Sequence, residues 1–264
     1  MAHAVAPKTI RLSEKEFQKC NETRICWLGN GGAYINSRGI RIMIDPLLEG
    51  FDMPMLSESP IRPEEVPSLD MVLITHSDND HMNVGVCRKL AKICNSFHTT
   101  EYVAELLQKE GIPALGHEIG DEIRIGDIRI RMTPADHAWQ NDIPGFSDHI
   151  FQKKDCCGFY ILTPDGKIWM PGDSRLLEEQ LTQPEPDMIL LDFSDSTWHI
   201  GLKGAVKLAD TYPHATLIPI HWGCVDSEMP EFNGDPEKLR SLISNSQREY
   251  VAAPGEMIRL SQNV

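Results

Sequence analysis

The sequence contains no apolar run near the roughly 18 to 20 residues that a transmembrane helix needs. Its first 15 residues lack the basic segment and following apolar stretch that mark a secretory leader. We therefore expect a cytoplasmic protein with no membrane partner. Internal repeats, low-complexity linkers and charge blocks are also missing, which favours a single domain over residues 1–264.

Basic residues are scarce: 25 Lys and Arg stand against 39 Asp and Glu, for a formal net charge of −14. A field of this sign repels polyanions, so we expect no nucleic acid partner. Cysteine is sparse too. The seven cysteines include no CxxC pair, which is typical of reduced cytosolic thiols. The adjacent Cys156 and Cys157 fit small buried side chains better than a redox pair.

What is present is a globular composition, 41% hydrophobic and 24% charged. Apolar runs bounded by turn residues predict strands over Thr23–Leu28, Ala33–Ile35, Ile40–Ile44, Met71–Thr75, Ile123–Ile125, Ile128–Met132, Gly158–Leu162, Ile168–Met170, Met188–Leu191 and Ala215–Ile220. Apolar residues at helical spacing predict a helix around Val86, Leu90 and Ile93, and others over 101–109, 202–209 and 236–244. Hairpins mixed with strand-helix alternation favour two sheets covered by helices.

Four potential metal ligands directly follow a buried strand, in the segment THSDNDH from Thr75 to His81. They are His76, Asp78, Asp80 and His81. Imidazole nitrogen and carboxylate oxygen suit Zn, Mn or Fe, and side chains two apart in a turn reach one point while their neighbours reach another. The alternative is a solvated polar turn, because Asp, Asn and Ser are also favoured turn residues.

Further ligand-type residues follow other apolar strands, namely His137 in TPADH, Asp173 in WMPGDS and His221 in LIPIHWG. Loops at strand ends build many binding sites, so we expect these side chains to converge. The default for the other histidines is a surface or hydrogen-bonded role: His3, His98, His117, His149, His199 and His214. Of these, His199 keeps a functional interpretation, because it lies just beyond the strand that ends near Asp192.

Taken in order, these motifs resemble the metallo-β-lactamase superfamily from Cys26 to Ile258, with WLGNGGAYINSRGIRIMIDP as its first meander and an HxHxDH-like ligand string. The resemblance implies an α/β fold, an αββα sandwich of two mixed β-sheets flanked by helices. It implies one metal on His76, Asp78 and His137, a second on Asp80, His81 and His221, and Asp173 as the bridge. Asp45 is then expected to orient a ligand ring from behind.

Within the superfamily, the chain is most similar to the branch that contains ascorbate-6-phosphate lactonase, through WLG, MPGDS, DMILL and IPIHWG. Two positions depart from the pattern, because Asp78 and Asn30 stand where histidines are usual or frequent. A carboxylate ligand favours harder ions, so we expect two divalent ions, Zn or Mn, with Fe as a further option. An acidic residue here also resembles the flavodiiron proteins, which keeps a di-iron oxidoreductase or oxygen-dependent enzyme as an alternative.

The resemblance implies that a metal-bound hydroxide hydrolyses a lactone, ester or phosphodiester of a small molecule. Asp80 and Asp173 are candidate catalytic proton carriers, and His199 is a candidate donor to substrate. Asp192 and Asp195 fit helix capping as well as catalysis. A noncatalytic metal-binding protein is a third function class. The long segment 139–155 fits a substrate lid, a packing excursion or a contact within a homo-oligomer.

Overall fold

The computed structural model describes residues 4–94, 96–229 and 232–260. Within them, one sheet has the order β13-β1-β2-β3-β4-β5-β6 and the other has the order β12-β11-β10-β9-β8-β7. The strands of the first sheet are β1 (Thr23–Gly29), β2 (Gly32–Ser37), β3 (Ile40–Ile44), β4 (Met71–Leu73), β5 (Phe97–Thr100), β6 (Ala114–His117) and β13 (Met257–Arg259). Those of the second are β7 (Glu122–Ile125), β8 (Ile128–Pro134), β9 (Cys157–Thr163), β10 (Gly166–Met170), β11 (Met188–Asp192) and β12 (Thr216–Ile220).

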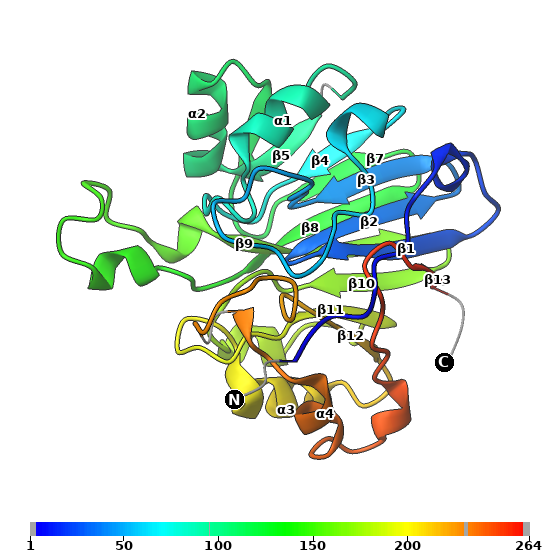
Figure 1. Cartoon of the computed structure of the whole chain (residues 1–264), viewed down its shortest axis with the longest axis vertical. Coiled ribbons are helices and arrows are strands. Elements are labelled where there is room, and N and C mark those ends of the chain that lie inside the picture. Colours follow the sequence, from blue (N-terminus) through cyan, green and yellow to red (C-terminus); the bar gives the residue numbers. More distant parts are fainter. Residues whose placement is uncertain (1–3, 95, 230–231, 261–264) are drawn as a thin grey trace.

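Helices cover the outer face of each sheet (Figure 1). They are α1 (Val84–Leu90) and α2 (Glu101–Lys109) on the first sheet, and α3 (Gly201–Thr211) and α4 (Pro236–Arg240) on the second. Short 3-10 helices complete the fold: η1 (Glu14–Phe17), η2 (Pro63–Glu65), η3 (Trp139–Asp142), η4 (Lys153–Asp155), η5 (Glu178–Leu181) and η7 (Ser246–Arg248). This arrangement confirms the predicted αββα sandwich of two mixed sheets.

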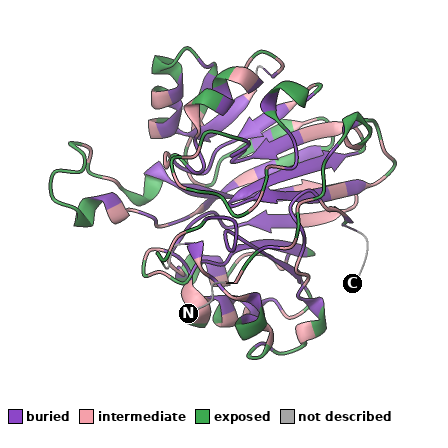
Figure 2. Cartoon of the chain, in the orientation of Figure 1, coloured by how far each residue is buried: buried purple, intermediate pink, exposed green. Residues whose placement is uncertain are grey.

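The side chains of β1 pack alternately into two different apolar clusters, which explains why this strand is apolar on both faces. Ile25 and Trp27 pack in the core between the two sheets, whereas Cys26 and Leu28 lie in the cluster under α1 and α2. Because successive side chains of a strand point to opposite faces, a strand buried on both faces must be an apolar run. A third cluster packs β11 and β12 against α3 and α4. Figure 2 shows the resulting concentration of buried residues in the strands.

The structure confirms the predicted hairpins. Arg38 and Gly39 form the two-residue turn between β2 and β3, both with positive φ, and the turn of residues 126–127 joins β7 to β8. The helix over 101–109 is confirmed at both ends. The remaining predicted strands and helices agree in position, with ends that differ by a few residues.

Two predicted elements are too long. The strand over 71–75 ends at Leu73, because the Asp45 carboxylate takes the main-chain N–H of Thr75 (2.8 Å) out of the sheet ladder. The helix over 236–244 ends at Arg240. There the N–H and hydroxyl of Ser244 donate to Asp210 of α3, which draws the chain off the helical path.

Three strands were missed, namely β5, β6 and β13. Their sequences, FHTT, ALGH and MIR, are too short and too polar to show a period of two. They form because the neighbouring strands offer a sheet edge, and β5 extends the first sheet through parallel pairing of Val72 with Phe97.

Strand direction brings the ends of several strands to one edge of the sandwich. β3 and β4 run parallel, as do β10, β11 and β12, and β8 follows the direction of β10 because both are antiparallel to β9. Main-chain hydrogen bonds join the two sheets at this edge, from Cys157 to Thr75 (3.0 Å) and from His221 to Asn30 (2.8 Å). Residues that follow these strands therefore meet.

All seven cysteines are free thiols, as the sequence predicted. Burial raises the pKa of Cys87 and of Cys156 to about 12, so these thiols stay protonated and unreactive. Cys156 and Cys157 are buried. Within the described part of the chain, every helix is too short or too polar to cross a bilayer.

Candidate metal centre

The segment 75–81 leaves β4 as a compact turn, in which the N–H of His81 donates to the carbonyl of Asp78 (2.9 Å). His76, Asp80 and His81 are buried, and only 14% of the Asp78 side chain is exposed. The alternative of a solvated polar turn is therefore wrong.

The three residues assigned to a first metal lie together. Asp78 Oδ2 is 3.5 Å from His76 Nε2 and 3.3 Å from His137 Nε2. Two ligand atoms that are each about 2.1 Å from a tetrahedral ion lie about 3.4 Å apart, so these separations fit one cation. The Nδ1 of His137 donates to the main-chain carbonyl of Trp198 (2.9 Å), which turns Nε2 toward Asp78.

The three residues assigned to a second metal also lie together. His221 Nε2 is 3.3 Å from Asp80 Oδ2 and 3.2 Å from His81 Nε2. Asp173 Oδ2 faces both groups, at 3.0 Å from His81 Nε2, 3.2 Å from His221 Nε2 and 4.0 Å from His76 Nε2. Asp173 thus lies where a bridging carboxylate was expected.

Hydrogen bonds behind the cluster fix the imidazole rings. Asp45 Oδ2 accepts from His81 Nδ1 (2.9 Å) and from the Thr75 hydroxyl (2.6 Å). The same hydroxyl oxygen accepts from His76 Nδ1 (2.8 Å). One buried carboxylate therefore orients both rings and leaves their Nε2 atoms for the centre of the site. The resemblance pointed to Asp45, whereas the sequence gave no separate signal for Thr75.

Asp78 receives two donors from the start of the long segment 139–155. The indole Nε1 of Trp139 donates to Oδ2 (2.7 Å), and the amide Nε2 of Gln140 donates to Oδ1 (2.6 Å). Gln140 is only 4% exposed, although most of the segment after it is exposed. Sequence reasoning missed this contact, because the two residues are about 60 positions from Asp78. The departure at position 78 gave a signal, since a buried carboxylate needs donors.

Two local features fit the presence of a cation. The Nε2 atom of His76 is buried and finds no hydrogen-bond partner among the described residues, although it faces two carboxylates. A buried nitrogen of this kind is satisfied by coordination to a metal. Gly31 makes room for the second group, because a Cβ at that position would lie 2.2 Å from Cε1 of His81. The residues present therefore fit a divalent metal.

The charges in the cluster attract positive charge. Burial opposes ionisation of Asp78 and Asp173, but the surrounding histidines outweigh it and hold the pKa of each carboxyl well below its usual value. Burial opposes protonation of His221, but Asp173 and Asp80 raise the pKa of His221 to about 9. A metal ion can take the place of these protons, so metal binding is expected to release them.

Backbone strain gathers at the same edge. Three of the five non-glycine residues with positive φ in the described chain lie here: Asn30 (45°), Asp45 (44°) and His221 (61°). Such conformations cost about 1–3 kcal/mol each and cluster at functional sites. Asn30, the second departure from the family pattern, donates its Nδ2 to Asp80 Oδ2 (3.0 Å) and thus holds a carboxylate of the cluster.

Of the other candidates, His199 and Asp192 lie at the cluster, whereas Asp195 lies outside it. His199 is buried at the cluster, where its Nδ1 donates to Asp192 Oδ2 (2.9 Å) and lies 3.7 Å from Asp173 Oδ2. Asp195 is exposed, and its Oδ1 accepts from the N–H of Leu202 in the first turn of α3 (3.4 Å). The capping interpretation therefore fits Asp195, whereas Asp192 belongs to the site.

The remaining histidines lie away from the cluster. His98 and His117 hydrogen bond to each other (2.8 Å), His149 bonds to Asp155 (2.9 Å), and His214 is exposed. These roles agree with the surface or hydrogen-bonded default. His3 lies outside the described residues.

A pocket of about 420 Å³ opens onto the cluster. Trp139 and Ile143 of the segment 139–155 contribute to its wall. The rest of this segment, green in Figure 1, projects from the sandwich, and Figure 2 shows it as largely exposed. The lid interpretation of the whole segment stays a prediction.

The histidines and aspartates gathered at the strand ends of the αββα sandwich are a donor set that suits a divalent metal ion. Residues 40–222 match the model of the beta-lactamase superfamily domain. The chain therefore belongs to the beta-lactamase superfamily, as the sequence motifs predicted.

Similar proteins and a similar crystal structure agree with this assignment. The chain is similar to the UPF0173 metal-dependent hydrolase of Caldivirga maquilingensis, with 27% identity over 89% of this chain and 96% of that protein. It is also similar to the UPF0173 metal-dependent hydrolase of Archaeoglobus fulgidus, with 28% identity over 88% of this chain and 97% of that protein. The fold matches the crystal structure of a possible metal-dependent hydrolase from Veillonella parvula, with a TM-score of 0.73 and 18% sequence identity. The match covers 90% of this chain and 99% of that chain. The prediction of a metal-dependent hydrolase agrees with these names.

Proposed function

We propose that this protein is a metal-dependent hydrolase that cleaves a carbonyl ester or lactone of a small molecule, using two divalent ions. The observation that carries the proposal is the pair of His and Asp groups that share Asp173 at the base of the pocket. Phosphodiesters are the second substrate class that such a centre fits. The names of the UPF0173 relatives support the hydrolase class.

A divalent ion at this site supplies Lewis acidity and lowers the pKa of a water molecule that it binds. The chain's own residues position the reactants and carry protons. Asp173 and Asp80 line the pocket, and their carboxylate oxygens are our candidates for accepting a proton from the attacking water. Asn30 keeps one of these oxygens oriented through its hydrogen bond to Asp80.

His199 is our candidate for the group that protonates the leaving oxygen. Its Nδ1 is committed to Asp192, so Nε2 is the ring nitrogen left for a substrate in the pocket. A carboxylate that accepts a hydrogen bond from one ring nitrogen fixes the orientation and the tautomer of the imidazole. His199→Gln is therefore expected to lower kcat far more than metal content.

The experiment that tests the proposal compares turnover and metal content in the same preparations. Chelator treatment is expected to abolish hydrolysis of a panel of lactones, esters and phosphodiesters, and added Zn, Mn or Fe to restore it. His76→Ala is expected to lose both metal and turnover, whereas His98→Ala, a buried histidine outside the cluster, keeps both. Undiminished turnover after complete metal removal contradicts the proposal. Activity that needs iron together with oxygen or an electron donor favours the di-iron alternative instead.

A further inference from the structure

The walls of the pocket at the metal centre are aromatic and aliphatic. They are formed by Phe51, Met53, Trp139, Ile143, Trp198 and Phe232. The Phe232 ring stacks on the His221 ring (5.8 Å, 13°), and Phe51 meets Phe232 edge to face (6.1 Å). An apolar wall thus continues directly from a residue of the metal cluster.

Positive side chains are missing from the same walls. The charged residues that line the pocket outside the cluster are Asp52 and Asp142, and none of its described lining residues is Lys or Arg. The nearby Arg175 is not one of the lining residues: its guanidinium carbon stacks 3.6 Å from the centre of the Trp198 ring, and its Nε donates to the carbonyl of Thr197 (3.0 Å). The pocket therefore lacks the cationic clamp that an anionic group needs.

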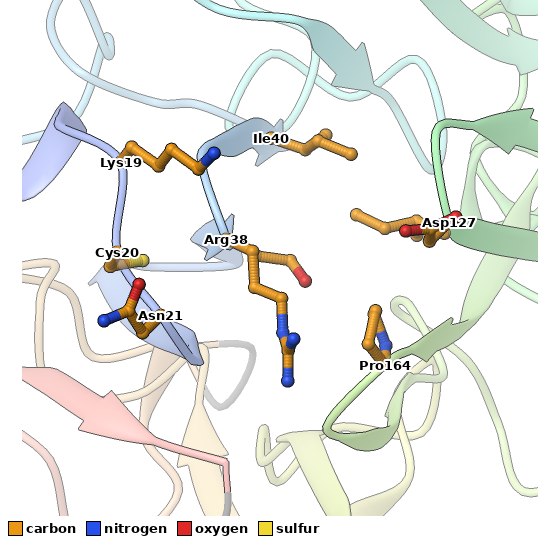
Figure 3. A pocket seen from close by; sticks show the side chains of 9 residues that line it. Lys19, Cys20, Asn21, Arg38, Ile40, Asp127 and Pro164 are labelled. Atoms are coloured by element: carbon orange, nitrogen blue, oxygen red, sulfur yellow. The ribbon is translucent and has the colours of Figure 1, made fainter.

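Basic side chains do line a cleft at the opposite edge of the sandwich. A cleft of about 500 Å³ between the β2–β3 turn and the β7–β8 turn is lined by Lys19 and Arg38, with Asp127 across from them (Figure 3). Arg38 is already paired with Asp165 there, at 3.1 Å from Nε to Oδ2. The chain thus places basic side chains around a cleft, but away from the metal centre.

Metal ions at the centre add little attraction for an anion. The carboxylates of Asp78, Asp80 and Asp173 offset most of the charge of two divalent ions, and Asp52 and Asp142 add negative charge at the rim. An anionic substrate therefore meets opposing charge on its way to the centre, whereas an uncharged one does not.

We infer that the substrate is an uncharged ester or lactone with an aliphatic or aromatic group that packs against Phe232, and that anionic counterparts are rejected. This inference rests on the proposed function. A pocket of about 420 Å³ is of the size that holds a single small molecule. The polar centre and apolar wall are adjacent, so the carbonyl carbon and the apolar group belong to the same compact molecule.

A matched pair of substrates tests the inference on the metal-loaded protein. p-Nitrophenyl butyrate and mono-p-nitrophenyl succinate have the same leaving group and the same acyl chain length, and differ by one terminal carboxylate. We expect kcat/KM to be at least about tenfold higher for the butyrate ester. Replacing both carboxylates at the rim, in the double variant Asp52→Asn and Asp142→Asn, is expected to lower the ratio of kcat/KM for the butyrate ester to kcat/KM for the succinate ester. The carboxylate of the succinate ester also attacks its own ester carbonyl, so the spontaneous rate of each ester is subtracted. An equal or higher enzyme-dependent kcat/KM for the succinate ester overturns the inference.

Variants of the wall test the apolar contact. Phe232→Ala is expected to reduce the preference for p-nitrophenyl butyrate over the acetate by about tenfold, because the longer chain loses its packing surface. Leu115→Ala is the matched control, an apolar residue of β6 that is 57% exposed and outside the pocket, and the preference should stay unchanged. An unchanged preference in Phe232→Ala argues against this contact.

A binding measurement tests this inference separately from the proposed function, because it does not depend on turnover. Calorimetric titration with the uncleaved anilide analogues, p-nitrobutyranilide and p-nitrosuccinanilic acid, reports the charge preference without turnover. Tighter binding of the neutral anilide together with no hydrolysis of any ester supports the inferred preference of the pocket for uncharged molecules and counts against the proposed hydrolase. Hydrolysis combined with tighter binding of the acid, or no binding of either anilide, overturns the inference.

Discussion

Asp78 stands where the superfamily pattern usually has a histidine, and the hydrogen bond from Gln140 shows how its carboxylate is positioned. The amide Nε2 of Gln140 donates to Asp78 Oδ1 at 2.6 Å, while the other carboxylate oxygen faces His76 and His137. Gln140 therefore holds the carboxylate so that one oxygen points at the first metal group. Gln140→Met keeps the size and apolar stem of the side chain but removes the donor.

A hydrogen bond to a charged group contributes about 1.5–3 kcal/mol, which corresponds to about 10–160-fold in an equilibrium constant. Loss of a partner behind a metal ligand weakens metal binding by a similar factor. We therefore expect Gln140→Met to raise the dissociation constant of the more affected metal by about 10–100-fold. Trp139→Phe, which removes the other donor but keeps an aromatic ring, is expected to act in the same direction.

The assay is competition for metal with a chromophoric chelator, on protein whose thermal unfolding without metal has been recorded. Gln108→Met is the matched control, because the Gln108 amide donates to the carbonyl of Ala114 (2.8 Å), far from the cluster. Its metal affinity should equal that of the unaltered protein. A folded Gln140→Met variant with unchanged metal affinity would refute the role of this hydrogen bond.

Two further predictions concern packing and pH. Gly31→Ala places a methyl group 2.2 Å from Cε1 of His81, so we expect loss of the second metal with little loss of the first; equal retention of both contradicts the close packing. Burial raises the pKa of Glu249 to about 7 despite Arg240, so the folded state binds this proton more tightly than the unfolded chain does. The stability gained is full below about pH 4.5 and is lost as pH rises through 7, by about 2–3 kcal/mol relative to Glu249→Gln in denaturant titrations. Parallel pH profiles for the two proteins would contradict the shift.

The order of apolar strands and helical stretches was enough to predict two sheets covered by helices, and the resemblance to the superfamily implied that they form an αββα sandwich. The ligand-type residues after the strands were enough to predict which side chains meet at one edge. Parallel strands end at the same edge, so residues such as His137 and His221 converge although they are distant in sequence. The short strands β5 and β13 could not be found, because their pairing depends on neighbouring strands rather than on their own pattern.

The hydrogen-bond partners of the ligands were largely hidden from the sequence. Gln140 lies in a segment whose other residues are mostly exposed, and nothing in its own neighbourhood marks it as the partner of Asp78. Thr75 is similar, since a threonine at a strand end is common and its link between Asp45 and His76 exists only in three dimensions. The sequence indicates which groups are available, and the backbone path decides which of them face each other.

The most direct measurement is the metal content of the purified protein after reconstitution with Zn, Mn or Fe and removal of excess ions by gel filtration. We expect two equivalents per chain, with one lost in His137→Ala and the other in His221→Ala, because each variant lacks one ligand of one group. Folded protein that retains no metal under any of these conditions would contradict the central claim.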